Sequence, residues 1–134
     1  VVAGPGSGSE PEHWGPGVVR IEKIPDNHLA GLYQNSALFI YPALYDGTAM
    51  RVLEALRAGA CVVTPNSGAV TELAGDAPFY YTPESAGSFI QAVRWAMEQS
   101  QKQNSERIRL GRRAAAAHSW EKTAWKILSA FRRV

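Results

Sequence analysis

The sequence predicts an α/β fold: a Rossmann-like parallel sheet with helices on both faces, ending in C-terminal helices. Short apolar runs alternate with segments of helical periodicity, which is typical of βα units in a parallel sheet. The run at 37–41 is almost wholly apolar, as expected for a strand that is covered on both faces. With 134 residues, of which 46% are hydrophobic, we expect one domain with a packed core.

Each element is predicted from its local pattern. In chain order we expect strands at 1–3 and 18–21, a helix at 26–35, a strand at 37–41, a helix at 50–58, a strand at 61–64, a short helix at 69–74, a strand at 79–81, and helices at about 82–99, 106–117 and 119–134. Asp26 is predicted to cap the first helix and Ser119 the last. Residues 4–17 are predicted to be a connector, because they lack the Gly-Lys-Ser/Thr ending of a phosphate loop.

Composition excludes several classes of protein. Cys61 is the single cysteine, so an internal disulfide and a multi-cysteine metal site are impossible, which fits a reducing compartment. No apolar run approaches the roughly 20 residues needed to cross a bilayer. The chain starts at Val1 in mid-strand and without a signal-peptide pattern, so we expect a piece of a longer, cytoplasmic protein.

Charge is distributed unevenly, although the net charge is only +2. Residues 1–93 carry four basic and nine acidic side chains, whereas residues 94–134 carry ten basic and three acidic ones. The basic C-terminal region is either a solvated helical surface or a face for acidic lipid, nucleic acid or a partner domain. Because no aromatic-basic interleaving or nucleic-acid motif accompanies it, we expect no nucleic-acid partner. Peripheral contact with a membrane surface stays open as an alternative.

The stretch from Asp46 to Ala55 is the most informative part of the chain. Asp46 and Glu54 stand eight residues apart, with a small-residue turn at 47–49 between a predicted strand and a predicted helix. Such a turn exposes backbone N–H groups at a helix N-terminus, which is an anion site. Two carboxylates beside an anion site indicate a ligand that carries hydroxyl groups as well. A nucleotide-sugar has both parts.

The helix that follows this turn has its own pattern. Met50, Leu53 and Leu56 recur at spacings of three, which indicates its buried stripe, and Gly59 is placed to end it. Ligands of open α/β sheets bind at the carboxyl ends of the strands. The Asp46 turn and a second turn at 65–68 are both predicted to lie at that edge. The four tryptophans, in contrast, are predicted to pack rather than to bind sugar: Trp14, Trp95, Trp120 and Trp125.

Residues 39–56, FIYPALYDGTAMRVLEAL, resemble the core motif of retaining GT-B glycosyltransferases of group 1 (family 4-like). The pattern of that family is a strand, Pro-Ser, two residues, Glu-Gly-Phe-Gly and then Leu-Glu-Ala. Residues 58–64 and 68–77 resemble the continuation of the family, and Ser-Trp-Glu at 119–121 resembles its usual end. The resemblance covers most of residues 18–134.

The resemblance implies that residues 1–134 are one partial domain, the nucleotide-sugar-binding C-terminal half of a GT-B fold. Residues 119–134 would form a trailing helix that packs back toward an N-terminal acceptor domain. The implied reaction transfers a sugar from a nucleotide-diphosphate sugar to an acceptor with retention of configuration. It implies no metal and no cofactor besides the donor substrate.

Site roles follow from the same resemblance. Glu54 matches the acid that accepts hydrogen bonds from the donor ribose, and Asp46 matches the acid that contacts the transferred sugar. The amides of the turn and first helical residue would meet the sugar and diphosphate: Gly47, Thr48, Ala49 and Met50. Each acid has a plainer interpretation. Glu54 is otherwise an exposed helical glutamate, and Asp46 a helix-start acid that the macrodipole favours.

Departures from the family pattern support a rival hypothesis. Asp46 replaces the usual Glu, Thr48-Ala49 replaces Phe-Gly, and Arg51 replaces a Pro. The family's diphosphate-neutralising Arg and Lys lie on an earlier strand and loop, outside this chain. We therefore expect the 134 residues alone to be inactive. The alternative is a pseudoenzyme, a non-catalytic nucleotide-binding or interaction module with a basic C-terminal helical face.

Overall fold

The computed structural model describes residues 1–4, 15–99 and 101–132, without the side chains of 101–103. The predicted connector at 4–17 and Trp14 therefore lie largely outside the described residues. The strands are β1 (Val2–Ala3), β2 (Arg20–Ile21), β3 (Phe39–Ile40), β4 (Val62–Pro65) and β5 (Phe79–Tyr81). All described pairings are parallel, in a two-stranded sheet of order β1-β2 and a three-stranded sheet of order β3-β4-β5. The predicted α/β fold with parallel strands is confirmed.

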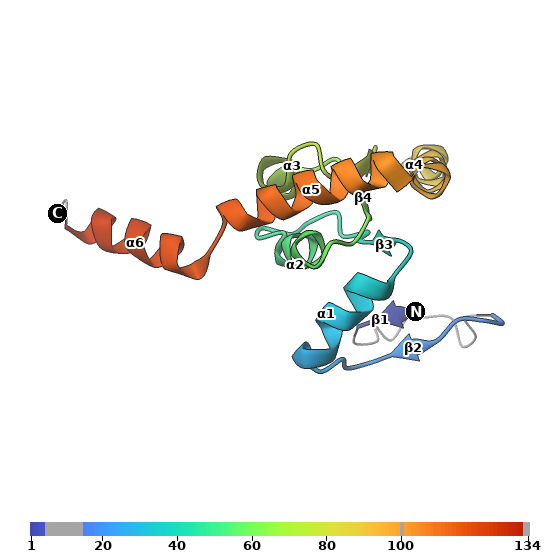
Figure 1. The fold of residues 1–134 in the computed structure, drawn as a ribbon, viewed down its shortest axis with the longest axis horizontal. Coiled ribbons are helices and arrows are strands. Elements are labelled where there is room, and N and C mark those ends of the chain that lie inside the picture. Colours follow the sequence, from blue (N-terminus) through green and yellow to red (C-terminus); the bar gives the residue numbers. More distant parts are fainter. Residues whose placement is uncertain (5–14, 100, 133–134) are drawn as a thin grey trace.

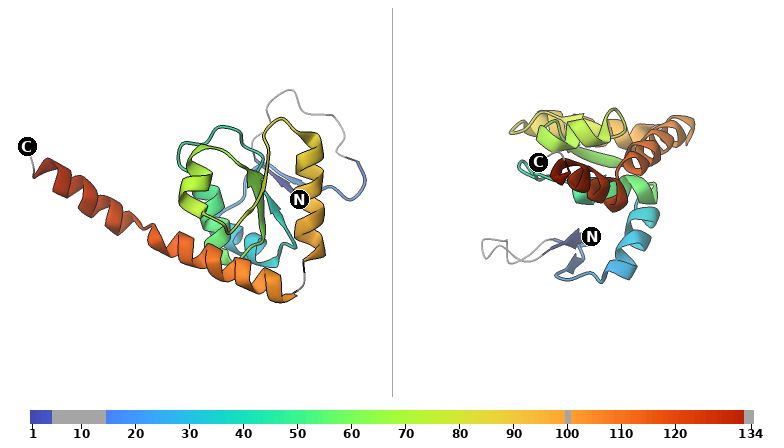
Figure 2. Two further views of the ribbon diagram at one scale, coloured as in Figure 1. Left: turned by 90° about the horizontal axis from the view of Figure 1, so that it is seen from above. Right: turned by 90° about the vertical axis from the view of Figure 1, so that its left-hand side faces the viewer.

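Helices cover both faces of the three-stranded sheet (Figure 2). They are α1 (Asp26–Asn35), α2 (Met50–Ala58), α3 (Gly68–Ala74), α4 (Ala86–Glu98), α5 (Gln101–Ala117) and α6 (Trp120–Phe131). In the left view of Figure 2, α2 and α3 lie on one side of the strands and α4 lies on the other. The two-stranded sheet lies next to α1, below the larger sheet in Figure 1.

The core has two halves because successive side chains of a strand point to opposite faces. Val62 belongs to the cluster formed with α2, α3 and α5, which includes the buried Leu56 and Val70. Val63, its neighbour on β4, belongs to the cluster formed with α4 and β5, together with Phe79. All four residues of β4 are buried, as predicted for the centre of a parallel sheet.

Helix ends follow the predicted signals at Gly59 and Ser119. Gly59 has φ 92°, a left-handed conformation that glycine adopts without steric cost, and its N–H donates to the carbonyls of Ala55 and Leu56. The Ser119 hydroxyl accepts from the Lys122 N–H at 3.2 Å and caps α6. The predicted cap at Asp26 is wrong. Pro25 occupies the N-cap of α1 without a side-chain bond, and Asp26 lies in the first helical turn.

The predicted stripe of α2 is also wrong in part. Its buried residues are Val52, Ala55 and Leu56, whereas Met50 and Leu53 are half-buried. The helix packs against α5 as well as against the sheet, so its buried face is turned from the stripe that a spacing of three indicates. The long C-terminal helix α5 also starts earlier than predicted, at Gln101 rather than near 106.

Arg107 ties α5 to the start of β5. Its Nη1 donates to three successive carbonyl oxygens, those of Asp76, Ala77 and Pro78, at 2.9 to 3.2 Å. Its guanidinium also lies over the ring of Phe79, 4.1 Å from the centroid. One side chain therefore satisfies a loop that would otherwise expose its carbonyls and stacks on the core beside it.

The last helix, α6, extends away from the rest of the molecule (Figure 1). None of its residues is buried, and Trp120 and Phe131 are 77% and 76% exposed. Trp125 and Trp95 are also more than half exposed. Within the described residues Trp120 and Trp125 are largely exposed, so their packing stays a prediction, whereas the Trp95 ring packs against Phe79. Within the described ranges, no helix combines the length and apolarity that a membrane crossing needs.

Candidate functional site

The loops after β3 and β4 meet at one edge of the sheet, at the carboxyl ends of the strands. The Ser67 hydroxyl, after β4, donates to the Leu44 carbonyl, after β3, at 3.5 Å. The N-terminus of α2 begins at the same edge, since Met50 follows the β3 loop directly. The two turns that the sequence singles out therefore lie together, at the edge where parallel α/β sheets bind ligands.

Hydrogen bonds fix the Asp46 side chain at this edge of the sheet. Its Oδ2 accepts from the Tyr41 hydroxyl at 2.7 Å, and its Oδ1 accepts from the N–H and hydroxyl of Thr48 at 2.9 and 3.0 Å. The Thr48 N–H, followed by the Tyr41 hydroxyl, lowers the pKa of Asp46 below its usual value, so the carboxylate is ionised at neutral pH. The pKa of Tyr41 is raised to about 12, and burial is the largest cause and the hydrogen bond to Asp46 the second.

The turn between Asp46 and α2 passes through a left-handed residue. Ala49 has φ 47° and ψ 27°, is fully buried and occupies the N-cap of α2 without a side-chain bond. Its carbonyl accepts the first helical hydrogen bond, from the Leu53 N–H. The next three N–H groups, from Met50 on, precede the helical ladder and point out of the N-terminus. The conformation is one that a Cβ disfavours, and the family pattern has glycine there.

The four turn amides proposed for the sugar and diphosphate have different surroundings. Thr48 donates its N–H to Asp46, and the Ala49 N–H also acts on this carboxylate and lowers its pKa, so both amides are already engaged. Ala49 is buried and Gly47 is exposed, whereas Met50 is half-buried at the first position of α2. The structure brings all four residues to one turn, and their contact with a ligand stays a prediction.

Glu54 lies on the second turn of α2 and forms an ion pair. Arg51 Nη1 donates to its Oε2 at 3.0 Å, with the side chains of Arg51 and Glu54 51% and 39% exposed. Tyr33 of α1 lies beside this pair. Burial is the largest cause that raises the pKa of Tyr33, and the charge of Glu54 is the second. The charge of Arg51 and its hydrogen bond lower that pKa. The glutamate is thus accessible and oriented, which suits an acceptor of ligand hydroxyls.

Sequence reasoning missed two partners at this site. Tyr41, directly after β3, donates to Asp46, and the signal was a tyrosine that follows an apolar strand at the ligand-binding edge. Arg51 stood out as a departure from the family pattern, but its pairing with Glu54 was not predicted, although a spacing of three on a helix brings such side chains together.

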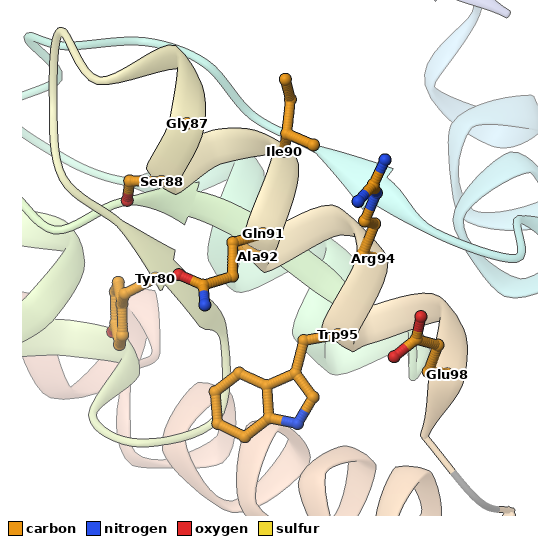
Figure 3. A pocket seen from close by; sticks show the side chains of 9 residues that line it. All are labelled: Tyr80, Gly87, Ser88, Ile90, Gln91, Ala92, Arg94, Trp95 and Glu98. Atoms are coloured by element: carbon orange, nitrogen blue, oxygen red, sulfur yellow. The ribbon is translucent and has the colours of Figure 1, made fainter.

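Metal-binding groups are absent from the described residues, where no three His, Cys, Asp or Glu side chains gather. A separate open hollow lies on the outer face of α4, beside β5 (Figure 3). Tyr80, Gln91 and Trp95 line part of it, and it includes none of the predicted site residues. The candidate site is therefore the one at the strand ends, formed by the Asp46 turn and the start of α2.

Comparisons with known proteins identify the family of this chain. The model of the family "Glycosyl transferases group 1" matches residues 13–116. The chain is 27% identical over 109 residues to O-antigen chain mannosyltransferase B of Escherichia coli, a match that covers 81% of this chain and 28% of that protein. It is 28% identical over 114 residues to the serotype-specific mannosyltransferase WbdA of Escherichia coli, covering 83% of this chain and 14% of that protein. The chain thus spans less than a third of the length of these relatives.

Among solved structures, the chain resembles the catalytic domain of Starch Synthase IV from Arabidopsis thaliana, bound to ADP and acarbose. The TM-score is 0.69 at 18% sequence identity, and the match covers 85% of this chain and 26% of that one. This likeness shows the fold, the Rossmann-like C-terminal half of a GT-B structure. Because the family model covers most of its residues, the chain belongs to the glycosyl transferases of group 1.

Proposed function

We propose that this chain is the donor-binding part of a retaining glycosyltransferase that uses a nucleotide-diphosphate sugar. The observation that carries the proposal is the strand-end turn, which places an ionised Asp46 at the N-terminus of α2 and an accessible Glu54 on the same helix. Family membership supports it, and so do the two mannosyltransferases that the chain resembles.

In this proposal Glu54 accepts hydrogen bonds from the ribose hydroxyls of the donor. A carboxylate offers about four acceptor positions, and Arg51 takes one of them. The N–H groups at the start of α2 would face the diphosphate, where the positive end of the helix stabilises the charge that builds on the leaving phosphate. No metal is needed for that stabilisation in this proposal.

Asp46 would contact the transferred sugar. Its carboxylate already accepts three hydrogen bonds from Tyr41 and Thr48, and the Ala49 N–H acts on it as well, so at most about one of its roughly four acceptor positions is open to a ligand. Asp46 is thus suited to accept from a single sugar hydroxyl while it holds the turn in shape. Transfer with retention would proceed on the face of the leaving phosphate, without a covalent nucleophile from the protein.

Nucleotide binding tests the donor-site role. We would titrate the protein with UDP, GDP and ADP by calorimetry and compare Glu54→Ala with Glu98→Ala, which removes an exposed glutamate from α4 on the opposite face. We expect one nucleotide to bind, Glu54→Ala to weaken it about tenfold or more, roughly 1.4 kcal/mol, and Glu98→Ala to leave it unchanged. Equal affinities for the two variants would contradict the role of Glu54.

A second candidate is a non-catalytic nucleotide-binding or interaction module. The observation that favours it is that Asp46 has a structural task of its own, since three internal donors engage it. This candidate predicts nucleotide binding without sugar transfer or donor hydrolysis in the full-length protein. Product formation there, with the anomeric configuration read by NMR, would support the enzyme instead.

The remaining parts of the proposal concern the whole protein. An acceptor-binding domain of the same protein would complete the site, and the 134 residues alone would not turn over. The exposed apolar residues of α6, such as Trp120 and Phe131, give that helix a surface for such a domain. A cytoplasmic location, or one at the membrane surface, agrees with the single half-buried cysteine.

A further inference from the structure

We propose that Arg51 is a positioning residue of the donor site: it fixes the Glu54 carboxylate in the orientation that accepts the two ribose hydroxyls. This inference rests on the proposed function, because it assigns a role to the neighbour of the proposed ribose acceptor. Arg51 does not match the family pattern, which has a proline at its position.

The geometry of the pair leaves the useful part of Glu54 free. Arg51 Nη1 binds Oε2 at 3.0 Å, and no other side-chain partner of Glu54 occurs in the described part of the chain. Oε1 and the second lone pair of Oε2 are therefore available, which is what two adjacent hydroxyls need. Both residues lie on the first two turns of α2, directly after the strand-end turn.

Arg51 is itself placed against a rigid part of the molecule. Tyr33, which interacts with both members of the pair, is only 5% exposed and belongs to the core. Its ring packs edge-on against Phe39 of β3, with centroids 4.9 Å apart. An arginine that is bonded to Glu54 and interacts with this core tyrosine loses little freedom when a ligand binds, so the acceptor is oriented in advance.

Charge supplies a second reason for this arrangement. Arg51 is the one Lys or Arg in the sequence between Lys23 and Arg57. Arg57 has other partners, since its Nη2 donates to the carbonyls of Ala115 and His118. A carboxylate that binds a ribose lies near the diphosphate of the same nucleotide, and the two repel. Arg51 offsets that repulsion at the carboxylate itself.

The pair contributes little to folding, which makes the inference testable. Exposed ion pairs on helices are worth about 0–1 kcal/mol of stability. Arg51→Ala is therefore expected to fold normally, and a loss of binding would report on the site. Arg109→Ala is the matched control, because it removes an exposed ion pair of the same spacing, with Glu106 on α5.

The experiment is a double-mutant cycle on the full-length protein with two ligands. We would measure the affinity of wild type, Arg51→Ala, Arg51→Lys, Glu54→Ala and Arg51→Ala/Glu54→Ala for the nucleoside diphosphate that binds among UDP, GDP and ADP. The second ligand is its 2′,3′-dideoxy analogue, which keeps the diphosphate and lacks both hydroxyls. Calorimetry gives both affinities.

We expect Arg51→Ala to weaken the ribonucleotide about five- to tenfold, up to roughly 1.4 kcal/mol, and to leave the dideoxy analogue unchanged. The effect should vanish in the Glu54→Ala background, and Arg51→Lys should restore part of it. Arg109→Ala should bind like wild type.

Three results would overturn the inference. An equal loss for both ligands, or a loss that persists without Glu54, would mean that Arg51 contacts the diphosphate itself. A wild-type affinity for Arg51→Ala, while Glu54→Ala is weak, would remove the positioning role and leave the donor site intact. If wild type binds none of the three nucleotides, the proposed function fails first, and the inference fails with it.

Discussion

The Tyr41 hydroxyl donates to Asp46 Oδ2 at 2.7 Å and so ties the end of the β3 strand to the turn that begins α2. The two residues are five positions apart, and the loop between them includes the fully exposed Tyr45. The bond closes the loop, and Asp46 also accepts both donors of Thr48. The Tyr41 hydroxyl and Thr48 together hold the Asp46 carboxylate at the candidate site.

Tyr41→Phe should therefore loosen the site and keep the fold. The change removes one hydrogen bond to a charged acceptor, so we expect a loss of about 1 kcal/mol in the free energy of unfolding. Donor affinity should fall as well, because Asp46 loses one of its supports. Urea unfolding and nucleotide titration would measure the two effects. Tyr45→Phe is the control, since its side chain lies in solvent, and an equal effect of both changes would disprove the role of the bond.

Stability should depend on pH through the same pair of residues. The folded-state pKa of Asp46 is lowered, so its stabilising contribution is present above the ordinary carboxyl value of 3.8 and is lost as the pH falls through the folded pKa. The folded-state pKa of Tyr41 is raised to about 12, so its contribution is present below 10.0 and is lost as the pH rises toward 12. Urea midpoints from about pH 2 to 12 would show both losses, and Tyr41→Phe should abolish the alkaline loss and reduce the acidic one.

Ala49 offers a test of backbone strain. A left-handed alanine costs about 1–2 kcal/mol, whereas removal of its buried methyl group forfeits about 0.8 kcal/mol. Ala49→Gly should therefore leave the unfolding free energy within about 1 kcal/mol of wild type or raise it. Ala49→Val should cost more than about 2 kcal/mol, because a β-branched side chain suits neither the conformation nor the buried site. A harmless Ala49→Val would contradict the left-handed geometry. Ala37→Val, at an exposed position, is the control.

Replacement of Thr64 by valine should stabilise the folded protein. Its hydroxyl is fully buried on β4 and has no hydrogen-bond partner among the described residues. An unpaired buried hydroxyl costs about 1–3 kcal/mol, and valine has nearly the same shape. We expect Thr64→Val to raise the free energy of unfolding by about 1 kcal/mol. Thr71→Val, which loses a bond to the Gly68 carbonyl, should not gain. Destabilisation by Thr64→Val would show that the hydroxyl has a partner.

The Arg107 side chain should contribute strongly to the free energy of unfolding. Arg107→Ala leaves the carbonyls of Asp76, Ala77 and Pro78 without their shared donor and uncovers Phe79, so we expect a loss of about 2–4 kcal/mol. Arg107→Lys should recover part of it, because one ammonium keeps the charge but not the planar stacking. Thermal unfolding would rank the variants. Arg109→Ala should keep the wild-type midpoint, and a similar midpoint for Arg107→Ala would refute the tie.

The sequence was sufficient for the features that depend on local patterns. The strand, turn and helix around Asp46 and Glu54 follow from apolar runs, small residues and helical spacing, all within about 20 positions. The ends at Gly59 and Ser119 follow from residues whose backbone or side chain suits those positions.

Features that depend on distant contacts were not predictable in this way. The buried face of α2 is determined by its contact with α5, which lies more than 40 residues away along the chain. Spacing alone could not include that contact, and it therefore placed Met50 and Leu53 in the buried stripe. The Tyr41–Asp46 bond depends on the path of an irregular loop, and the handedness of Ala49 on how that loop enters the helix. The exposed tryptophans of α6 follow hydrophobicity rules only if something outside the described residues covers them.

Because α6 is exposed, the intrinsic fluorescence of its tryptophans should change when another molecule or domain covers this helix. Trp120 and Trp125 are two of the protein's four tryptophans, and both rings face solvent on a helix without buried residues. Indole emission moves to shorter wavelength when water leaves the ring. A domain, a second copy or a lipid surface that covers this helix would therefore shift the intrinsic fluorescence to the blue, and Trp120→Phe and Trp125→Phe would show which ring is covered, without any added label.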